Sequence, residues 1–540
     1  MKRIILPVLV TFLSITTALG VPAKRGPRTV RQSDGNELTI YAHGDEFCHW
    51  LTDAAGNIVE EQEDGTYVLT DRKADEATLS QRRANSRRTQ VAEKKRRVSA
   101  AASQAQPLNI APRGLIILVG YSDKAFSTSR NEIDSMINGL NYTRSYTYRD
   151  SYGTTVNVSA SGSARQYFID QAMGTYKPHF DIVGPYTLSK TLSYYGRNGS
   201  NGDDQNVDKL IVEACQLADA DGVDFSLYDN NNDNEIDFVF VIYAGYGEAD
   251  GGANNTIWPH AYWMYDGYGQ TNYLDGKLLN TYACSNEINY ASDKHNGIGT
   301  FCHEFSHVLG LPDLYVTQAD SEHRTMGDWD ILDAGPYLND GNTPPAYSAY
   351  ERFFVGWMTP EILFANGSQS LEDLKTSNRA LIITETGVSN LIGNDPEPAT
   401  FYLLENRQKK GWDKHLPGHG MLITRIKYNY NTWYNNIPND DPNNMGVDII
   451  EANSRSSSRY GGAKDAYPAG ATSYKPFTGM TISDITETSG IISFDFSNSA
   501  SAVETVSGQA EDTNKTILNG QIRISRNGQM YDILGREIKQ

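Results

Sequence analysis

One short stretch restricts the possible folds of this chain more than any other. Residues 301–315 read FCHEFSHVLGLPDLY. His303 and His307 are four positions apart, so on a helix their side chains lie on one face about one turn apart. Gly310 allows the helix to end in a left-handed turn, and Pro312 prevents it from continuing. The stretch therefore predicts a helix that carries two imidazoles and is followed by a sharp reversal of the chain.

The same spacing predicts a zinc site. Zinc takes three or four N, O or S ligands in tetrahedral geometry, and a catalytic site keeps one position for water. His303 and His307 supply two ligands, and the carboxylate of Asp313 can return to the metal after the reversal. Glu304 can accept a proton from bound water. His260 is left as a core or supporting residue, because three ligands are already present.

The alternative is an ordinary polar helix end whose histidines make only local hydrogen bonds. The chain has only 10 histidines in 540 residues, so two of them in this register with a glutamate favour the metal site.

Length and charge limit the other possibilities. A chain of 540 residues predicts two to four folded units. The net charge of −19 argues against a nucleic-acid partner, which requires a basic face.

The N-terminus predicts a signal peptide. Lys2 and Arg3 precede the apolar run ILPVLVTFLSITTALG, which is short and is interrupted by Pro7. Ala18 and Gly20 are the small residues that a signal peptidase requires, so we predict cleavage after Gly20. An uncleaved anchor is the less favoured alternative. We expect no transmembrane span in the mature protein, since no other segment is long and apolar enough.

The rest of the chain changes character several times. Residues 21–70 alternate like a small all-β unit, and residues 71–105 carry basic clusters such as KKRR at 94–97. That basic linker is either a solvated spacer or a cleavable propeptide junction. The predicted units are a signal peptide at 1–20, a propeptide with basic linker at 21–105, a globular region at 106–498 that is β-rich near its end, a linker at 499–518 and a short tail at 519–540.

The four cysteines, Cys48, Cys215, Cys284 and Cys302, are too few for a disulfide framework in a chain of this length. Cys284 and Cys302 are the nearest pair and are predicted to form one bridge, with two buried free thiols as the alternative. A thiolate from Cys48 could block the zinc in a latent form, although a small buried side chain is the simpler interpretation.

The motif HEFSHVLGLPDLY resembles the extended zinc motif of the immune-inhibitor-A-type secreted metallopeptidases, peptidase family M6. These enzymes are similar to metzincins but have Asp where many metzincins have a third His. Other segments, including LVGYSDKAF, TIWPHAYW, WDILDAGPY and TPPAYSAYERFFVGWMTP, resemble that catalytic domain in the same order. The likeness covers roughly residues 110–498, and residues 27–70 resemble the family's propeptide.

The resemblance implies a fold and a set of roles. The fold would be an α+β or α/β metzincin-like catalytic domain with a small β-rich N-terminal propeptide and a β-rich C-terminal extension. His303, His307 and Asp313 would bind zinc, and Glu304 would activate the water. Metzincins carry a methionine in a turn beneath the metal.

Leu332 occupies the position of that methionine in WDILDAGPY, and its similar volume should preserve the base of the site. Tyr337 follows this turn and could polarise a substrate carbonyl, with a packed aromatic as the favoured alternative.

A second cation site is predicted in YDNNNDNEIDF. Alternating oxygen ligands on a tight loop suit calcium, and the candidates are Asp229, Asn231, Asp233 and Asp237. The loop is not an EF-hand, because Asn234 replaces the usual Gly and Phe240 stands where the bidentate Glu belongs. A solvated loop of Asx turns is the alternative.

The tail, with RISRNGQMYDILGREI, resembles the C-terminal sorting signal of type IX secretion found in Bacteroidetes. That resemblance implies the outer-membrane secretion machinery as a partner and a secreted or surface location.

Together these features predict a secreted zinc endopeptidase, made as a zymogen, that hydrolyses extracellular proteins or peptides. One alternative is a catalytically impaired, peptidase-like surface adhesin or binding protein. Another is a zinc hydrolase that acts on amide bonds outside proteins.

Overall fold

The computed structural model describes residues 19–74, 111–499 and 513–531, apart from short gaps at 25, 33, 47, 63, 151, 200–203, 318–322, 454–460, 519–520 and 527–528. The structure therefore does not describe residues 1–18 of the predicted signal peptide, nearly all of the basic linker, or the last residues of the tail.

A six-stranded sheet forms the centre of residues 111–358, which are named the catalytic lobe here because they contain the predicted zinc motif. Its order is β1-β13-β16-β12-β7-β10, with β1 Leu19–Gly20, β13 His260–Trp263, β16 Thr281–Asn286, β12 Val239–Tyr243, β7 Arg113–Gly120 and β10 His179–Thr187. The last four strands are parallel, and β13 is antiparallel to β16. The runs LIILV and VFVIY are buried throughout, which is why β7 and β12 take central positions in a parallel sheet.

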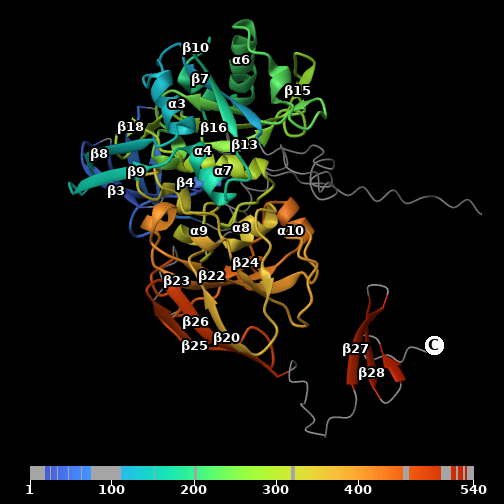
Figure 1. Ribbon diagram of the computed structural model, residues 1–540. Coiled ribbons are helices and arrows are strands. Elements are labelled where there is room, and N and C mark those ends of the chain that lie inside the picture. Colours follow the sequence, from blue (N-terminus) through green and yellow to red (C-terminus); the bar gives the residue numbers. More distant parts are fainter. Residues whose placement is uncertain are drawn as a thin grey trace, which may run out of the picture.

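Helices cover this sheet. They are α3 Arg130–Asn138, α4 Ala164–Gln171, α5 Leu192–Gly196, α6 Val207–Ala220 and α7 Gly299–Val308. The apolar residues predicted at helical spacing, including Leu210, Ile211 and Ala214, form the buried face of α6. Figure 1 places α7 at the level where the catalytic lobe meets the rest of the chain.

This lobe also contains shorter strands and 3-10 turns. They are a hairpin of β8 Thr143–Arg149 and β9 Thr155–Ser161, the strands β11 Glu235–Ile236, β14 Tyr273–Leu274, β15 Lys277–Leu279, β17 Ile288–Asn289 and β18 Lys294–His295, and the 3-10 turns η1 Phe225–Tyr228, η2 Glu248–Asp250, η3 Gly327–Trp329 and η4 Gly335–Tyr337.

Residues 359–498 form a C-terminal β lobe with its own apolar cluster. One sheet contains β19 Glu361–Ile362, β21 Leu381–Ile383, β22 Thr400–Arg407, β23 Gly420–Lys427 and β24 Val447–Ile449, and another contains β20 Gly367–Leu371, β25 Met480–Thr488 and β26 Ile491–Asn498. The helices α8 Ala349–Phe354, α9 Leu374–Ser377 and α10 Tyr430–Tyr434 lie at the junction of the lobes, and η5 Gly411–His415 follows β22 (Figure 1). The predicted β-rich end of the globular region is confirmed.

The side chain of Arg407 joins the two lobes in a buried position. Its guanidinium pairs with Asp413 at 2.6 Å and Glu405 at 3.1 Å, and it also donates to the carbonyl of Ala346 at 2.9 Å. Both carboxylates in turn accept backbone N–H groups from the segment that leads into α8. Because every charged group has a partner, the contact ties α8 and its N-terminal loop to β22 without leaving a buried charge alone.

The N-terminal residues form a five-stranded antiparallel sheet, and their role as a propeptide remains a prediction. The sheet contains β2 Pro27–Arg31, β3 Glu37–Asp45, β4 Cys48–Thr52, β5 Asn57–Glu61 and β6 Tyr67–Lys73. The predicted linker at 499–518 is wrong at its end, because β27 Thr513–Leu518 pairs with β28 Gln521–Arg526, which continues into β29 Gln529–Tyr531. Strand-forming residues such as Thr516 and Ile517 pair with their partners across the hairpin, which composition alone did not indicate.

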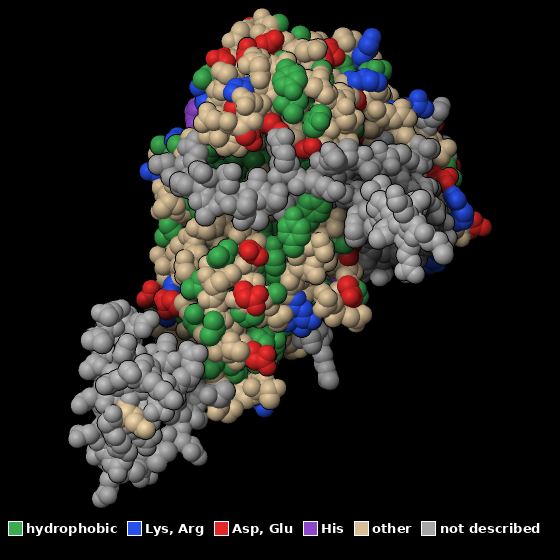
Figure 2. Space-filling view, turned by 90° about the vertical axis from the view of Figure 1, so that its right-hand side faces the viewer, with side chains coloured by type: hydrophobic (Ala, Val, Ile, Leu, Met, Phe, Trp, Pro, Cys, Tyr) green, Lys and Arg blue, Asp and Glu red, His purple; other side chains and the backbone are tan. Residues whose placement is uncertain are grey.

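The predicted Cys284–Cys302 disulfide is wrong. Both residues are free and fully buried, as is Cys215. Cys284 lies in β16 and Cys302 in α7, where each serves as a small apolar side chain. None of the helices in the described part of the chain combines the length and hydropathy of a membrane span. On the face drawn in Figure 2, the described acidic side chains are scattered over both lobes, with no continuous basic patch among them.

The start of α7 is fixed by close backbone packing. Gly299 lies so near the carbonyl of Pro336 that an added Cβ would clash with it, and its own N–H donates to the carbonyl of Gly341 at 2.8 Å. A Cβ added to Gly297 would likewise clash with the carbonyl of Gly341. These two glycines let α7 lie directly on the segment that contains η4, which sets the position of the histidines one turn later.

We expect the substitution Gly299→Ala to destabilise the protein by about 1–3 kcal/mol, because the new methyl group has no space beside Pro336. Thermal unfolding measures the loss, and zinc content measures whether α7 has moved. An unchanged melting temperature with full zinc content would show that this contact does not position the helix.

Candidate functional site

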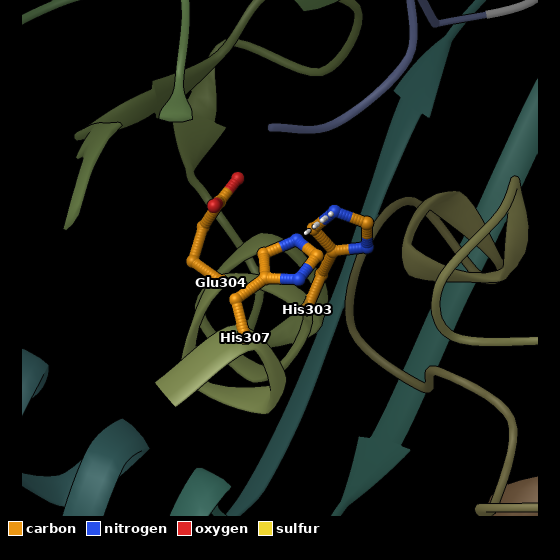
Figure 3. Close-up of side chains that lie close together, drawn as sticks. All are labelled: His303, Glu304 and His307. Carbon is orange, nitrogen blue, oxygen red and sulfur yellow. Dashed lines mark hydrogen bonds between the residues drawn. The ribbon is translucent and has the colours of Figure 1, made fainter. Parts of the chain in front are cut away.

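The predicted metal ligands converge on one buried point. In α7 the Nε2 atoms of His303 and His307 are 3.1 Å apart (Figure 3). The Oδ1 atom of Asp313 lies 3.2 Å from the first nitrogen and 3.4 Å from the second. All three side chains are almost completely shielded from solvent. A tetrahedral zinc with bonds of about 2.0–2.1 Å has ligand atoms about 3.3–3.4 Å apart, so the triangle fits one face of its coordination shell.

Backbone carbonyls fix the orientation of both imidazoles. His303 Nδ1 lies 2.7 Å from the carbonyl oxygen of Ile331, and His307 Nδ1 lies 2.9 Å from that of Leu311. Carbonyls only accept, so each Nδ1 carries the proton and each Nε2 has a free lone pair. Two lone pairs and a carboxylate oxygen therefore face one another, which is a stable arrangement around a cation.

The reversal after α7 delivers Asp313 as predicted. Gly310 takes the left-handed conformation with φ of 91°. The Oδ1 atom of Asp313 is buried and accepts no hydrogen bond from the described residues, while Oδ2 accepts from the side chain of Asn436 at 2.6 Å. Asn436 also accepts the N–H of Asp313 at 2.7 Å. Burial alone would raise the pKa of Asp313, but its interactions with His307 and His303 outweigh burial and lower the pKa below its usual range.

Asn436 was missed by sequence reasoning. It follows α10, 123 residues beyond Asp313 and outside the catalytic lobe. Its φ of 55° is a conformation that asparagine tolerates. Nothing in the local sequence marks this asparagine among the others of that segment.

Glu304 occupies the position of a general base beside the ligands. Figure 3 shows its side chain rising from the same helix beside the histidine pair, with the carboxylate pointing away from the helix. Neither oxygen accepts a full hydrogen bond among the described residues. Burial raises its pKa well above the usual range, and the negative charges of Asp313 and Glu46 add to the shift, whereas the N–H of Val21 opposes it. Two fully buried carboxylates so near each other, Glu304 and Asp313, again favour a bound cation.

The turn beneath the site includes Leu332, as predicted. Leu332 is completely buried, its N–H donates to Asp330 Oδ1 at 2.8 Å, and its carbonyl accepts the N–H of Leu314 at 2.8 Å. The turn therefore supports the segment that carries Asp313, and the carbonyl of Ile331 holds His303. Backbone groups make these contacts, which is why leucine can stand where metzincins have methionine.

The chain's own N-terminal segment, residues 19–24, crosses this site, as the blue ribbon in Figure 3 illustrates. Leu19–Gly20 pairs antiparallel with the edge strand β13. The carbonyl of Gly20 accepts from the hydroxyl of Tyr315, and that of Val21 accepts from Trp258 Nε1 at 2.9 Å. Tyr337 donates to the carbonyl of Pro22 at 2.6 Å. Sequence reasoning missed the contacts of Tyr315 and Trp258, and Tyr337 contacts a peptide carbonyl rather than only packing.

The N-terminal sheet is anchored to the catalytic lobe through His49. Its Nε2 lies 2.9 Å from Glu248 and its Nδ1 lies 3.2 Å from the carbonyl of Asp45, while the ring stacks on Trp258. Burial disfavours the charged ring, but Glu248 and Asp45 outweigh it, so the pKa of His49 is raised. The side chain of Cys48 lies outside the described residues, so its predicted contact with zinc remains a prediction.

The loop predicted to bind calcium uses its carboxylates internally. Asp229 accepts the N–H groups of Asp233 and Asn234 at 3.0 Å and pairs with Lys277 at 2.8 Å. Asp237 accepts the side-chain amide of Asn230 at 3.0 Å. These are the contacts of the alternative, a loop of Asx turns. Calcium binding by Asp229, Asn231, Asp233 and Asp237 remains a prediction.

His260 is a core residue rather than a ligand. Its ring contacts the carbonyl of Trp258 at 2.7 Å and the hydroxyl of Tyr282 at 2.8 Å, and burial lowers its pKa to about 4. It therefore stays neutral and supports the edge strand to which residues 19–20 add.

Comparison with known proteins locates a family over the same region. Residues 109–358 match the model described as the immune inhibitor A peptidase M6, catalytic domain. This part of the chain, of mixed α/β content, is therefore similar to a peptidase M6 catalytic domain.

Two curated relatives cover this region. The chain is 28% identical over 256 residues to the pre-pro-metalloprotease PrtV of Vibrio cholerae serotype O1, covering 42% of this chain and 27% of that protein. It is 24% identical over 274 residues to immune inhibitor A of Bacillus thuringiensis subsp. alesti, covering 44% of this chain and 39% of that protein. The match thus spans well under half the length of either relative.

We expect Asn436→Gly to weaken zinc binding by about 10–100-fold, because the variant loses the amide that orients Asp313. Glycine tolerates the positive φ, so the backbone should be preserved. Competition with a chelator measures the affinity. The neighbouring Asn435→Ala is the control, because that side chain donates to the carbonyl of Asn431. Equal affinities in both variants would contradict the role of Asn436.

We expect the N-terminal sheet to leave the catalytic lobe more easily as the pH rises. A histidine whose pKa is raised by docking contributes stability below its ordinary value near 6.5 and loses it as the pH rises through the docked value. After cleavage of the basic linker, the release rate of residues 21–74 between pH 5.5 and 8.5 measures this. His49→Gln should flatten the profile, and a pH dependence that survives in this variant would exclude His49.

Proposed function

We propose that this protein is a secreted zinc endopeptidase, made as a zymogen, that hydrolyses peptide bonds of extracellular proteins. The observation that carries the proposal is the buried triangle of His303, His307 and Asp313 with Glu304 beside it. The match to a peptidase M6 domain and the printed names of the relatives support the same activity.

The chain's own residues supply most of the expected chemistry. Bound zinc would polarise the scissile carbonyl and lower the pKa of a water molecule. Glu304, buried and adjacent, accepts the proton of that water and passes it to the leaving amine. Tyr315 and Tyr337 place hydroxyl donors where a peptide's carbonyls lie. The edge of β13, which residues 19–20 occupy in this structure, offers backbone groups that would hold a substrate as an added strand.

The zymogen is supported by the path of residues 19–24. With residues 19–20 present, the segment takes the edge of β13 and the hydroxyl of Tyr315. Residues 21–24, which remain after signal-peptide removal, keep Val21 on Trp258 and Pro22 on Tyr337 and so still obstruct the site. Removal of a signal peptide after Gly20 would make Val21 the first residue, at the carboxylate of Glu304. The N-terminal sheet would hold this segment in place until the basic linker is cut.

Secretion rests on the sequence. The signal peptide and the type IX sorting tail are proposed from their residues, and export through the outer-membrane machinery follows from the tail's resemblance. Both segments fall largely outside the described residues.

The variant Glu304→Gln tests the activity. We expect the wild-type chain to bind one zinc and, after mild trypsin treatment, to cleave an unfolded protein such as casein. Glu304→Gln should bind the same zinc and lose cleavage by at least about 100-fold, since it cannot accept a proton. Zinc in both proteins with cleavage in neither would favour the adhesin or binding-protein alternative, and a folded wild-type protein without zinc would refute the metal site.

A further inference from the structure

The N-terminal segment lies in the site with the direction of a substrate. The carbonyl of Gly20 faces the hydroxyl of Tyr315, and the N–H of Val21 faces the carboxylate of Glu304. A scissile peptide group needs this arrangement, because its carbonyl must meet a donor and its nitrogen must receive a proton from the glutamate. The Gly20–Val21 bond therefore takes the place of the scissile bond of a substrate. Val21 takes the place of the first substrate residue after the cut.

In this register, Lys24 stands for the fourth residue after the cut. Its backbone N–H donates to the carbonyl of Ala249 at 2.6 Å, which fixes it against η2. Its ammonium lies 3.4 Å from Asp340 Oδ1 and 3.4 Å from Asn289 Oδ1. Only 19% of the Lys24 side chain and 2% of the Asp340 side chain remain exposed.

The surroundings of this ammonium belong to the catalytic lobe. Asp340 is held in place by the hydroxyl of Tyr146, which donates to its second oxygen at 2.7 Å. Asp250 belongs to η2 and follows Ala249, whose carbonyl accepts from the N–H of Lys24. One oxygen of Asp250 accepts from Asn286 and the backbone of Tyr290, and the other is buried without a hydrogen-bond partner among the described residues.

We propose that Asp340 and Asn289 form an acidic subsite that binds a lysine or arginine side chain of the substrate, four residues after the scissile bond. The inference rests on the proposed peptidase function and names its substrate preference. When the N-terminal segment leaves, these groups keep their supports in the catalytic lobe but lose the cation that they now bind. A substrate bound in the same register supplies a new cation if its fourth residue after the cut is lysine or arginine. An apolar or acidic side chain at that position leaves the subsite without a cation.

Two peptides test the subsite. They share one sequence and carry either lysine or norleucine at the fourth position after the cut. For the trypsin-activated wild-type enzyme we expect kcat/KM to be about tenfold or more higher with lysine, as for a charged hydrogen bond. In Asp340→Asn the ratio should fall towards one. Asparagine tolerates the positive φ of this position and can still accept from Tyr146, so the fold should persist.

Asp293→Asn is the matched control. Asp293 also has a positive φ, is exposed, and accepts a hydrogen bond from Tyr246 rather than from Lys24. This variant should keep the full preference for lysine. Equal kcat/KM for the two peptides in wild type, or a preference that survives in Asp340→Asn, would overturn the subsite.

Binding separates failure of the subsite from failure of the proposed function. The activated Glu304→Gln variant needs no catalysis to bind the same peptides, and fluorescence anisotropy measures their affinities. The subsite is supported if Glu304→Gln binds the lysine peptide more tightly than the norleucine peptide, and the double variant Glu304→Gln/Asp340→Asn does not. This holds even if the wild-type protein cuts neither peptide. Equal affinities overturn the subsite even if casein is cleaved.

Discussion

Three acceptor atoms facing one another inside the protein are the feature on which the rest of the structure depends. Left alone, His303, His307 and Asp313 would place two lone pairs and a negative charge within 3.1–3.4 Å. That arrangement is unfavourable without a cation. The fold nevertheless enforces it, with carbonyls holding the imidazoles and Asn436 holding the carboxylate. The supports come from three separate parts of the chain, which makes the site a property of both lobes.

The edge strand β13 is the second feature that shapes the site. It is the antiparallel end of an otherwise parallel sheet, and its outer side is covered by the chain's own residues 19–20. An open edge strand is a general template for added strands. One short segment thus occupies both the edge of β13 and the hydroxyl of Tyr337.

The elements of the catalytic lobe were largely predictable. The apolar runs at β7 and β12 and the helical spacing in α6 gave the correct types of element, because their burial patterns repeat along the chain. The strand β27 was assigned to a linker, since its pairing partner lies beyond it in the sequence. The disulfide was wrong because nearness in sequence does not bring two thiols together when one lies in a strand and the other in a helix.

The sequence by itself determined the ligand set. Two histidines one helical turn apart, a glutamate between them and an aspartate after a Gly–Pro reversal are local features, and local geometry decides which way they point. Tertiary structure alone decided what surrounds them: Asn436 on Asp313, Tyr315 and Tyr337 on peptide carbonyls, and Asp340 on Lys24. These partners are separated by up to several hundred residues, and no periodicity or spacing connects positions that meet only after the core has packed.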